Sequence, residues 1–225
     1  MCSVIAQFFT NDHGDLSPQA RTYIAGLLTR CPRKNMERIA EELPGTVFQN
    51  LQYFISESRW ECSPLWKWIG ERAAKLLGGG SENMLRIDES GFTKKGVKSA
   101  GVGRQYNGRL GKVDNCQVGV FSALSHGIRA TLTGARLYLP EQWTEDGDRC
   151  EEAKIPACER GFRTKPELAW ELIEQAEKDG IPFGWVGMDA VYGRDQSLLL
   201  KISGMGRKFV ADVNHDQKVW PTQPE

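Results

Sequence analysis

The spacing of apolar residues changes at Gly78-Gly79-Gly80, and this change constrains the fold of the 225-residue chain more than any other feature. Before the glycines, apolar side chains recur every three or four residues, the period of amphipathic helices. After them, short apolar runs and alternating patterns predict strands. Because glycine readily adopts the left-handed conformation that ends helices, we predict a boundary here between two domains, residues 1–80 and residues 81–225.

Four amphipathic helices are predicted in residues 1–80, which makes the first domain all-helical. A tight turn at Leu43-Pro44-Gly45 joins the second helix to the third and permits a helix-turn-helix that binds DNA. The third helix would offer polar side chains to base edges, namely Gln49, Asn50 and Gln52. The alternative is a plain bundle, since four amphipathic helices in a row more often form only that.

Residues 81–225 alternate between predicted strands and helices, so the fold class is α/β with a mixed sheet. Strands are expected at 84–88, 116–121, 128–132, 136–139, 183–188 and 208–213. A capping box, Thr164 with Glu167, begins a long amphipathic helix, and residues 197–202 suggest a short one. Residues 140–163 are polar and lack a period, which predicts a loop insertion.

Two acids, Asp88 and Asp189, follow apolar runs at the predicted carboxyl ends of strands. Sites in open α/β sheets form at that edge, and two carboxylates meeting there repel unless a cation lies between them. Mg²⁺ suits such oxygen ligands and binds phosphates. We therefore expect the two carboxylates within roughly 4–7 Å of one another. The alternative is that both acids cap turns or pair with a nearby lysine.

Ordered blocks throughout the chain resemble the DDE superfamily endonucleases, the transposases of bacterial insertion sequences. The residues that carry the resemblance are Tyr23–Leu28, Ile87–Gly96 (IDESGFTKKG), Ser99–Tyr106, Gly111–Val120, Arg136–Pro140, Thr164–Ala169 and Trp185–Gly193 (WVGMDAVYG). The resemblance implies a ribonuclease-H-like catalytic core, incomplete at its C-terminus, preceded by the helical domain. It also implies that Asp88 and Asp189 are the first two catalytic and metal-binding acids, with Mg²⁺ or Mn²⁺ as the cofactor.

The third acid of the family is a glutamate on a helix beyond the last predicted strand, and neither Asp195 nor Asp212 matches it. The resemblance implies metal-dependent cleavage and strand transfer at the ends of the element. Its partners would be terminal inverted repeats, target DNA and a second transposase subunit. Because the glutamate is missing, the alternatives are an inactive DNA-binding fragment or regulator of transposition, and a nuclease with another third ligand. We expect little cleavage from this chain alone; an in-frame continuation downstream of codon 225 would favour the enzyme.

The neutral net charge conceals two oppositely charged segments. Residues 86–112 contain seven Lys or Arg and two acids, whereas residues 141–152 contain six acids and one Arg. A basic segment of this kind can bind the DNA backbone, and an aromatic residue within it can stack on a base; a solvated loop is the alternative. The candidate DNA-binding residues are Lys94, Lys95, Lys98, Arg104 and Tyr106. Glu89 is expected to pair with Lys94 or Lys95.

Composition indicates a cytoplasmic protein, and the resemblance implies a bacterial one. No apolar run approaches the roughly 18 residues of a membrane span, and the N-terminus lacks the pattern of a signal peptide. The six cysteines form no CxxC pair, which favours free thiols over a zinc site.

Overall fold

The computed structural model describes residues 2–12, 14–32 and 34–216. The chain forms two compact units, Met1–Trp68 and Ile69–Glu225, and the division falls inside helix α5 (Ser63–Leu77). Among the described residues, no helix has the length and apolar character needed to cross a bilayer.

The first unit is built around aromatic side chains. Phe9, Phe54 and Trp60 contact one another with ring centroids 5.1–5.9 Å apart. Helices α2 and α3 cross closely, because a Cβ at Gly26 would lie 2.2 Å from a methyl of Ile39. The elements of this unit are α1 (Cys2–Ile5), η1 (Ala6–Phe9), β1 (Thr10–Asn11), β2 (Gly14–Asp15), α2 (Ser17–Leu28), α3 (Met36–Glu42) and α4 (Phe48–Ser56).

The expectation of an all-helical first domain is wrong in one place, because β1 and β2 form an antiparallel hairpin. Asp15 stabilises the hairpin: its Oδ1 accepts hydrogen bonds from the Thr10 hydroxyl at 3.1 Å and from the Ser17 backbone N–H at 2.9 Å. Strands of two residues are too short to show an alternating pattern, so no periodicity in the sequence predicts them.

The second unit is a mixed sheet of six strands. Its strands are β3 (Met84–Thr93), β4 (Gly103–Asn107), β5 (Lys112–His126), β6 (Arg129–Tyr138), β7 (Trp185–Met188) and β8 (Lys208–Ala211). Strand β3 is central: it pairs antiparallel with β5 on one side and parallel with β7 on the other, and β8 continues parallel beyond β7. Both β4 and β6 pair with β5. This arrangement is consistent with the expected ribonuclease-H-like sheet.

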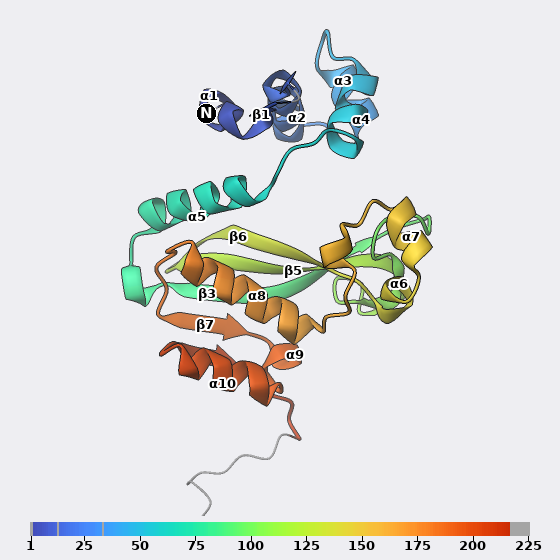
Figure 1. The fold of residues 1–225 in the computed structure, drawn as a ribbon. Helices are drawn as coiled ribbons and strands as arrows, with labels where there is room; N and C mark the ends of the chain where they lie inside the picture. Colours follow the sequence, from blue (N-terminus) through green and yellow to red (C-terminus); the bar gives the residue numbers. More distant parts are fainter. Residues whose placement is uncertain (1, 13, 33, 217–225) are drawn as a thin grey trace, which may run out of the picture. The chain divides into compact units, whose positions relative to one another are not determined.

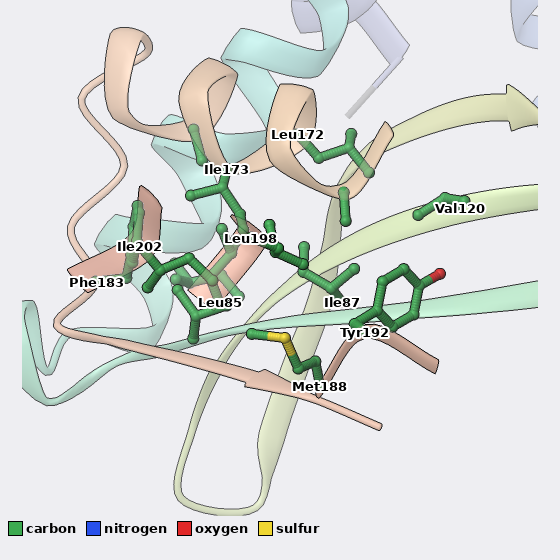
Figure 2. Close-up of a cluster of buried hydrophobic side chains, with 14 of the residues drawn as sticks. Leu85, Ile87, Val120, Leu172, Ile173, Phe183, Met188, Tyr192, Leu198 and Ile202 are labelled. Carbon is green, nitrogen blue, oxygen red and sulfur yellow. The ribbon is translucent and has the colours of Figure 1, made fainter. Parts of the chain in front are cut away.

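Helices cover one face of this sheet. Figure 1 shows α8 (Lys165–Lys178) lying across the strands, with α9 (Ala190–Gly193) and α10 (Gln196–Gly204) following β7. Their apolar side chains pack on those of β3, β5 and β7, and Figure 2 shows Leu172 and Ile173 of α8 above Leu85 and Ile87 of β3. The capping box that begins α8 is present, with hydrogen bonds between Thr164 and Glu167 in both directions, as the sequence predicts.

The opposite face carries exposed apolar side chains. Residues paired across a ladder point to the same side of a sheet, so Phe92, Leu132, Leu137 and Val210 lie on the face away from α8. Their exposed fractions run from 40% to 54%. Within the described residues of this unit, one face of the sheet is therefore packed and the other is open.

Several predicted boundaries differ from the structure. Strand β3 runs on to Thr93, so Asp88 lies inside the strand and not at its end, because the ladder with β5 continues as far as the Thr93–Cys116 pair. Residues 129–138 form one strand, β6, in place of two, with an irregularity opposite Ser122 and Ala123 of β5.

The polar insertion at 140–163, expected to be loop, contains helices α6 (Glu141–Thr144) and α7 (Gly147–Glu152) and the turn η3 (Ala157–Glu159). These pack around a second small core centred on Trp143, which is fully buried. The Trp143 indole N–H donates a 2.7 Å hydrogen bond to the Val102 carbonyl. The period was missed because each helix spans fewer than two turns.

Candidate active site

Asp88 lies within β3, and Asp189 directly follows the neighbouring strand β7 at the corresponding position. The parallel ladder of β3 and β7 pairs Met84 with Trp185 and ends at the pair Arg86–Gly187. Asp88 and Asp189 each follow that last pair by two residues, which in extended chain returns them to the same side of the sheet. Asp88 is directly opposite Phe121 of β5, so this side is the open face.

Local hydrogen bonds fix the orientation of both carboxylates. Oδ1 of Asp88 accepts from the Glu89 backbone N–H at 2.8 Å, and Oδ1 of Asp189 accepts from the Val191 N–H at 2.9 Å, which makes Asp189 the N-cap of α9. Neither acid has an ion-pair partner among the described residues. Asp189 therefore caps a turn, as the turn-capping alternative predicts, whereas neither acid pairs with a lysine in the part of the chain that the structure describes.

The two acids interact electrostatically. Burial raises the pKa of Asp88 above its ordinary value, and the negative charges of Asp189 and Glu89 raise it further, against the opposing effect of the Glu89 backbone hydrogen bond. A pair of neighbouring carboxylates without a basic partner is relieved by a divalent cation. The donor set, two carboxylates on an accessible sheet face, fits one Mg²⁺ that keeps several of its waters.

The prediction that Glu89 pairs with Lys94 or Lys95 is wrong, because Glu89 forms its ion pair with Lys165. The Lys165 ammonium donates to Oε1 at 2.6 Å, and the Tyr192 hydroxyl donates to Oε2 at 2.7 Å. Burial raises the pKa of Tyr192, and the Glu89 carboxylate raises it further, so the phenol keeps the proton it donates. Sequence reasoning missed these partners because they lie 76 and 103 positions away and no local period links them to Glu89.

A third metal ligand is not found among the described residues, where no group of three His, Cys, Asp or Glu side chains is placed to hold an ion. Of the remaining acids, Asp212 has the position in the sheet that is closest to that of a third ligand. Its backbone N–H donates to the Met188 carbonyl at 3.1 Å, and it follows the Gly187–Val210 pair by two residues. It therefore extends the row of Asp88 and Asp189 by one strand without completing a ligand group.

The candidate DNA-binding residues follow β3 and continue into β4. Lys95, Lys98, Arg104 and Tyr106 are exposed, and Lys94 is half-buried. Tyr106 lines a cavity of about 700 Å³ together with Glu89, Tyr138, Phe162, Lys165 and Arg194. The structure thus places Tyr106 in the same cavity as Glu89 and Lys165, and it leaves Lys95 and Lys98 exposed on the surface.

A mixed sheet with helices packed on one face is consistent with a ribonuclease-H-like fold of the DDE type. The chain belongs to the DDE superfamily endonucleases, whose family model matches residues 7–225. It is similar to the probable transposase for insertion sequence element IS701 of Microchaete diplosiphon, with 29% identity over 220 residues. That alignment covers 92% of this chain and 54% of the relative, so the chain spans about half the length of the curated relative it matches.

Proposed function

We propose that this chain carries the first two metal-binding acids of an insertion-sequence DNA transposase. The observation that carries the proposal is the placement of Asp88 in β3 and of Asp189 just after the adjacent parallel strand β7, each two residues beyond the last ladder pair of the two strands. Their resemblance-based assignment as catalytic acids agrees with this placement. A carboxylate separation of roughly 4–7 Å stays a prediction, testable in crystals soaked with Mn²⁺.

The proposed reaction is cleavage of a DNA strand at the element's end, followed by attack of the freed 3′-hydroxyl on target DNA. When bound, Mg²⁺ or Mn²⁺ would activate the attacking oxygen and stabilise the leaving one. Asp88 and Asp189 hold the cation site at the open face of the sheet. No nucleophilic side chain is required, since water and the 3′-hydroxyl are the attacking groups.

The proposed partners are the terminal inverted repeats, target DNA and a second transposase subunit. Exposed cations at Lys95, Lys98 and Arg104 support contact with phosphates. The exposed Tyr106 ring supports stacking on a base, because it lines the cavity beside Lys165 and Arg194. In the first unit, Gln49, Asn50 and Gln52 are exposed on α4, as base contacts by a helix-turn-helix would require.

A second candidate function is a DNA-binding regulator of transposition that does not cleave. It is favoured by one observation, the absence of a three-ligand group among the described residues. Two protein carboxylates hold one ion through water and phosphate, but a two-metal site requires a further ligand.

The test is a supercoiled plasmid carrying the element's ends, incubated with Mg²⁺ or Mn²⁺ and two polypeptides. One is the 225-residue chain, and the other adds whatever coding sequence continues in frame. For a transposase, we expect nicking by the longer polypeptide, abolished by Asp88→Asn and by Asp189→Asn. Nicking that survives both substitutions would overturn the assignment of these acids. Specific binding of the ends without nicking by either polypeptide would establish the regulator.

A further inference from the structure

Glu89 connects three elements at the back of the acid pair. Its Oε1 accepts from Lys165 at the start of α8, and its Oε2 accepts from Tyr192 on α9. The side chains of Glu89 and Lys165 are 16% and 21% exposed, and Tyr192 is fully buried. Both carboxylate oxygens are therefore used in a largely water-excluded contact, where such bonds are stronger and more directional than at the surface.

Each partner of the Glu89–Tyr192 hydrogen bond is a near neighbour of a candidate metal ligand. Glu89 immediately follows Asp88 in β3. Tyr192 lies in α9, the short helix that Asp189 caps through its bond to the Val191 N–H. Because consecutive residues in a strand point to opposite faces, Glu89 reaches toward α8 and α9 while Asp88 faces the open side. The bond therefore links the backbone segment that carries Asp88 to the segment that carries Asp189, and it leaves both of their carboxylates free of this contact.

This bond lies where the sheet no longer joins the two segments. The backbone ladder between β3 and β7 ends at Arg86–Gly187, two residues before each acid. The Glu89–Tyr192 bond joins the segments past that end. Figure 2 shows the Tyr192 ring at the margin of the apolar cluster beside Ile87 and Met188, with its hydroxyl directed away from them. Packing in the core thus fixes the Tyr192 ring, and the hydroxyl of that ring in turn fixes the Glu89 side chain.

We propose that Glu89 and Tyr192, with Lys165 as the neutralising charge, are positioning residues that set the separation of Asp88 and Asp189 for the metal. This inference rests on the proposed metal site. Metal ligands tolerate displacements of only about 0.5 Å, so a contact that fixes both backbones contributes to affinity without touching the ion. In metal sites, loss of such an outer partner typically weakens binding by about 10- to 100-fold.

The test is the affinity of the 225-residue chain for Mn²⁺, measured by electron paramagnetic resonance of the free ion, alongside the melting temperature. Glu89→Gln removes the charge, and Tyr192→Phe removes only the hydroxyl while keeping the ring in the core. We expect each to weaken Mn²⁺ binding by about tenfold. Because Tyr192→Phe preserves packing, it serves as the second variant if Glu89→Gln fails to fold.

Glu171 provides a matched control. As in Glu89, its two carboxylate oxygens accept from two different side chains, here both arginines, Arg136 at 3.2 Å and Arg163 at 3.0 Å, and its side chain is 28% exposed. It joins β6 to α8 away from the acids. Glu171→Gln should lower the melting temperature about as much as Glu89→Gln but leave Mn²⁺ affinity unchanged. Equal loss of affinity in both variants would make the Glu89 effect merely structural and overturn the proposal.

Two further outcomes separate this proposal from the metal site itself. If Asp88→Asn abolishes binding but Glu89→Gln and Tyr192→Phe bind Mn²⁺ like the wild type, the metal site stands and the positioning role is wrong. If Glu89→Gln abolishes binding while Tyr192→Phe has no effect, Glu89 is itself a ligand and the positioning role is again wrong. If the wild-type chain binds no Mn²⁺, or Asp88→Asn binds it equally, the metal site and the positioning role are both overturned.

Discussion

The phenolic oxygen of Tyr192 lies 2.7 Å from Oε2 of Glu89, although 103 residues of chain separate them. This contact and the Asp88–Asp189 pair involve the same two segments, one on each face of the sheet. The positioning role that we propose would couple the geometry of the acids on one face to hydrogen bonding on the other. We therefore expect substitutions at Glu89 or Tyr192 to reproduce part of the effect of losing Asp88 or Asp189.

Replacing Asp88 by Asn should stabilise the metal-free protein at neutral pH. Burial raises the folded-state pKa of Asp88, so the folded chain disfavours its ionised form. The penalty is complete above that raised pKa and disappears as the pH falls below the unfolded value of about 3.9. With chelator present, we expect Asp88→Asn to raise the melting temperature by roughly 1–3 °C at pH 7.

Differential scanning calorimetry at pH 7 and pH 4.5 checks this, because the gain should shrink at the lower pH. Added Mn²⁺ should reverse the order, since ligand binding stabilises only the chain that binds it. A gain of equal size at both pH values would show that relief of charge is not its cause.

Replacing Lys94, Lys95 and Lys98 by Ala should weaken binding to every DNA sequence by a similar factor. Phosphate contacts carry no sequence information, and each lost contact lowers the slope of log affinity against log salt by about one unit. Fluorescence anisotropy with two unrelated duplexes over a salt series measures both quantities. The control is Lys178→Ala with Lys201→Ala, which removes exposed charges on helices α8 and α10. An unchanged slope in the triple variant would exclude these lysines from the interface.

Trp143→Ala should release the insertion from the sheet. The buried indole fills the second core and bonds the Val102 carbonyl, and its loss should cost about 3–5 kcal/mol locally. Hydrogen exchange should increase in residues 141–160 and in the 97–102 loop, which Arg149 also contacts through the Val97 carbonyl at 3.0 Å. Protection retained in both segments would contradict a shared core. Trp143→Phe, which keeps most of the apolar volume, should have a smaller effect.

The open sheet face should make the 225-residue chain prone to self-association. Leu132, Leu137 and Val210 are at least 40% exposed on the face away from α8, and a patch of this kind tends to recruit apolar partners. Leu132→Glu with Leu137→Glu should reduce both the mass seen by light scattering and the binding of an apolar dye. An exposed leucine outside this face, Leu200→Glu on α10, is the control. If Leu200→Glu reduced light scattering and dye binding as much as the double variant does, the open face would have no special role in self-association.

The sequence predicted what local patterns can encode. The capping box of Thr164 and Glu167 predicted the start of α8. The apolar runs before Asp88 and Asp189 predicted the two strands, β3 and β7, that bring these acids to the middle of the sheet. Strand ends were less predictable, because β3 continues to Thr93 through pairing with a distant partner, Cys116. Pairing energy of this kind depends on the partner strand and is invisible in a local window.

The surroundings of the acids could not be predicted at all. Charge alone suggested Lys94 or Lys95 for Glu89, since both are near in sequence and follow the same strand. In the structure, α8 brings Lys165 to Glu89 instead. Which of several lysines reaches a carboxylate is decided by the packing of a helix on a sheet, which no periodicity records.

Three paired positions between β3 and β7 set the register of the two segments that carry the acids, and most of the hundred residues between the acids lie outside this ladder. Most of the intervening chain can therefore vary without changing how the two acids are aligned. Chain can be inserted or removed at the β5–β6 hairpin, where Ile128 is fully exposed beside Gly127 in the left-handed conformation, or around α6 and α7, without shifting the register of the central strands.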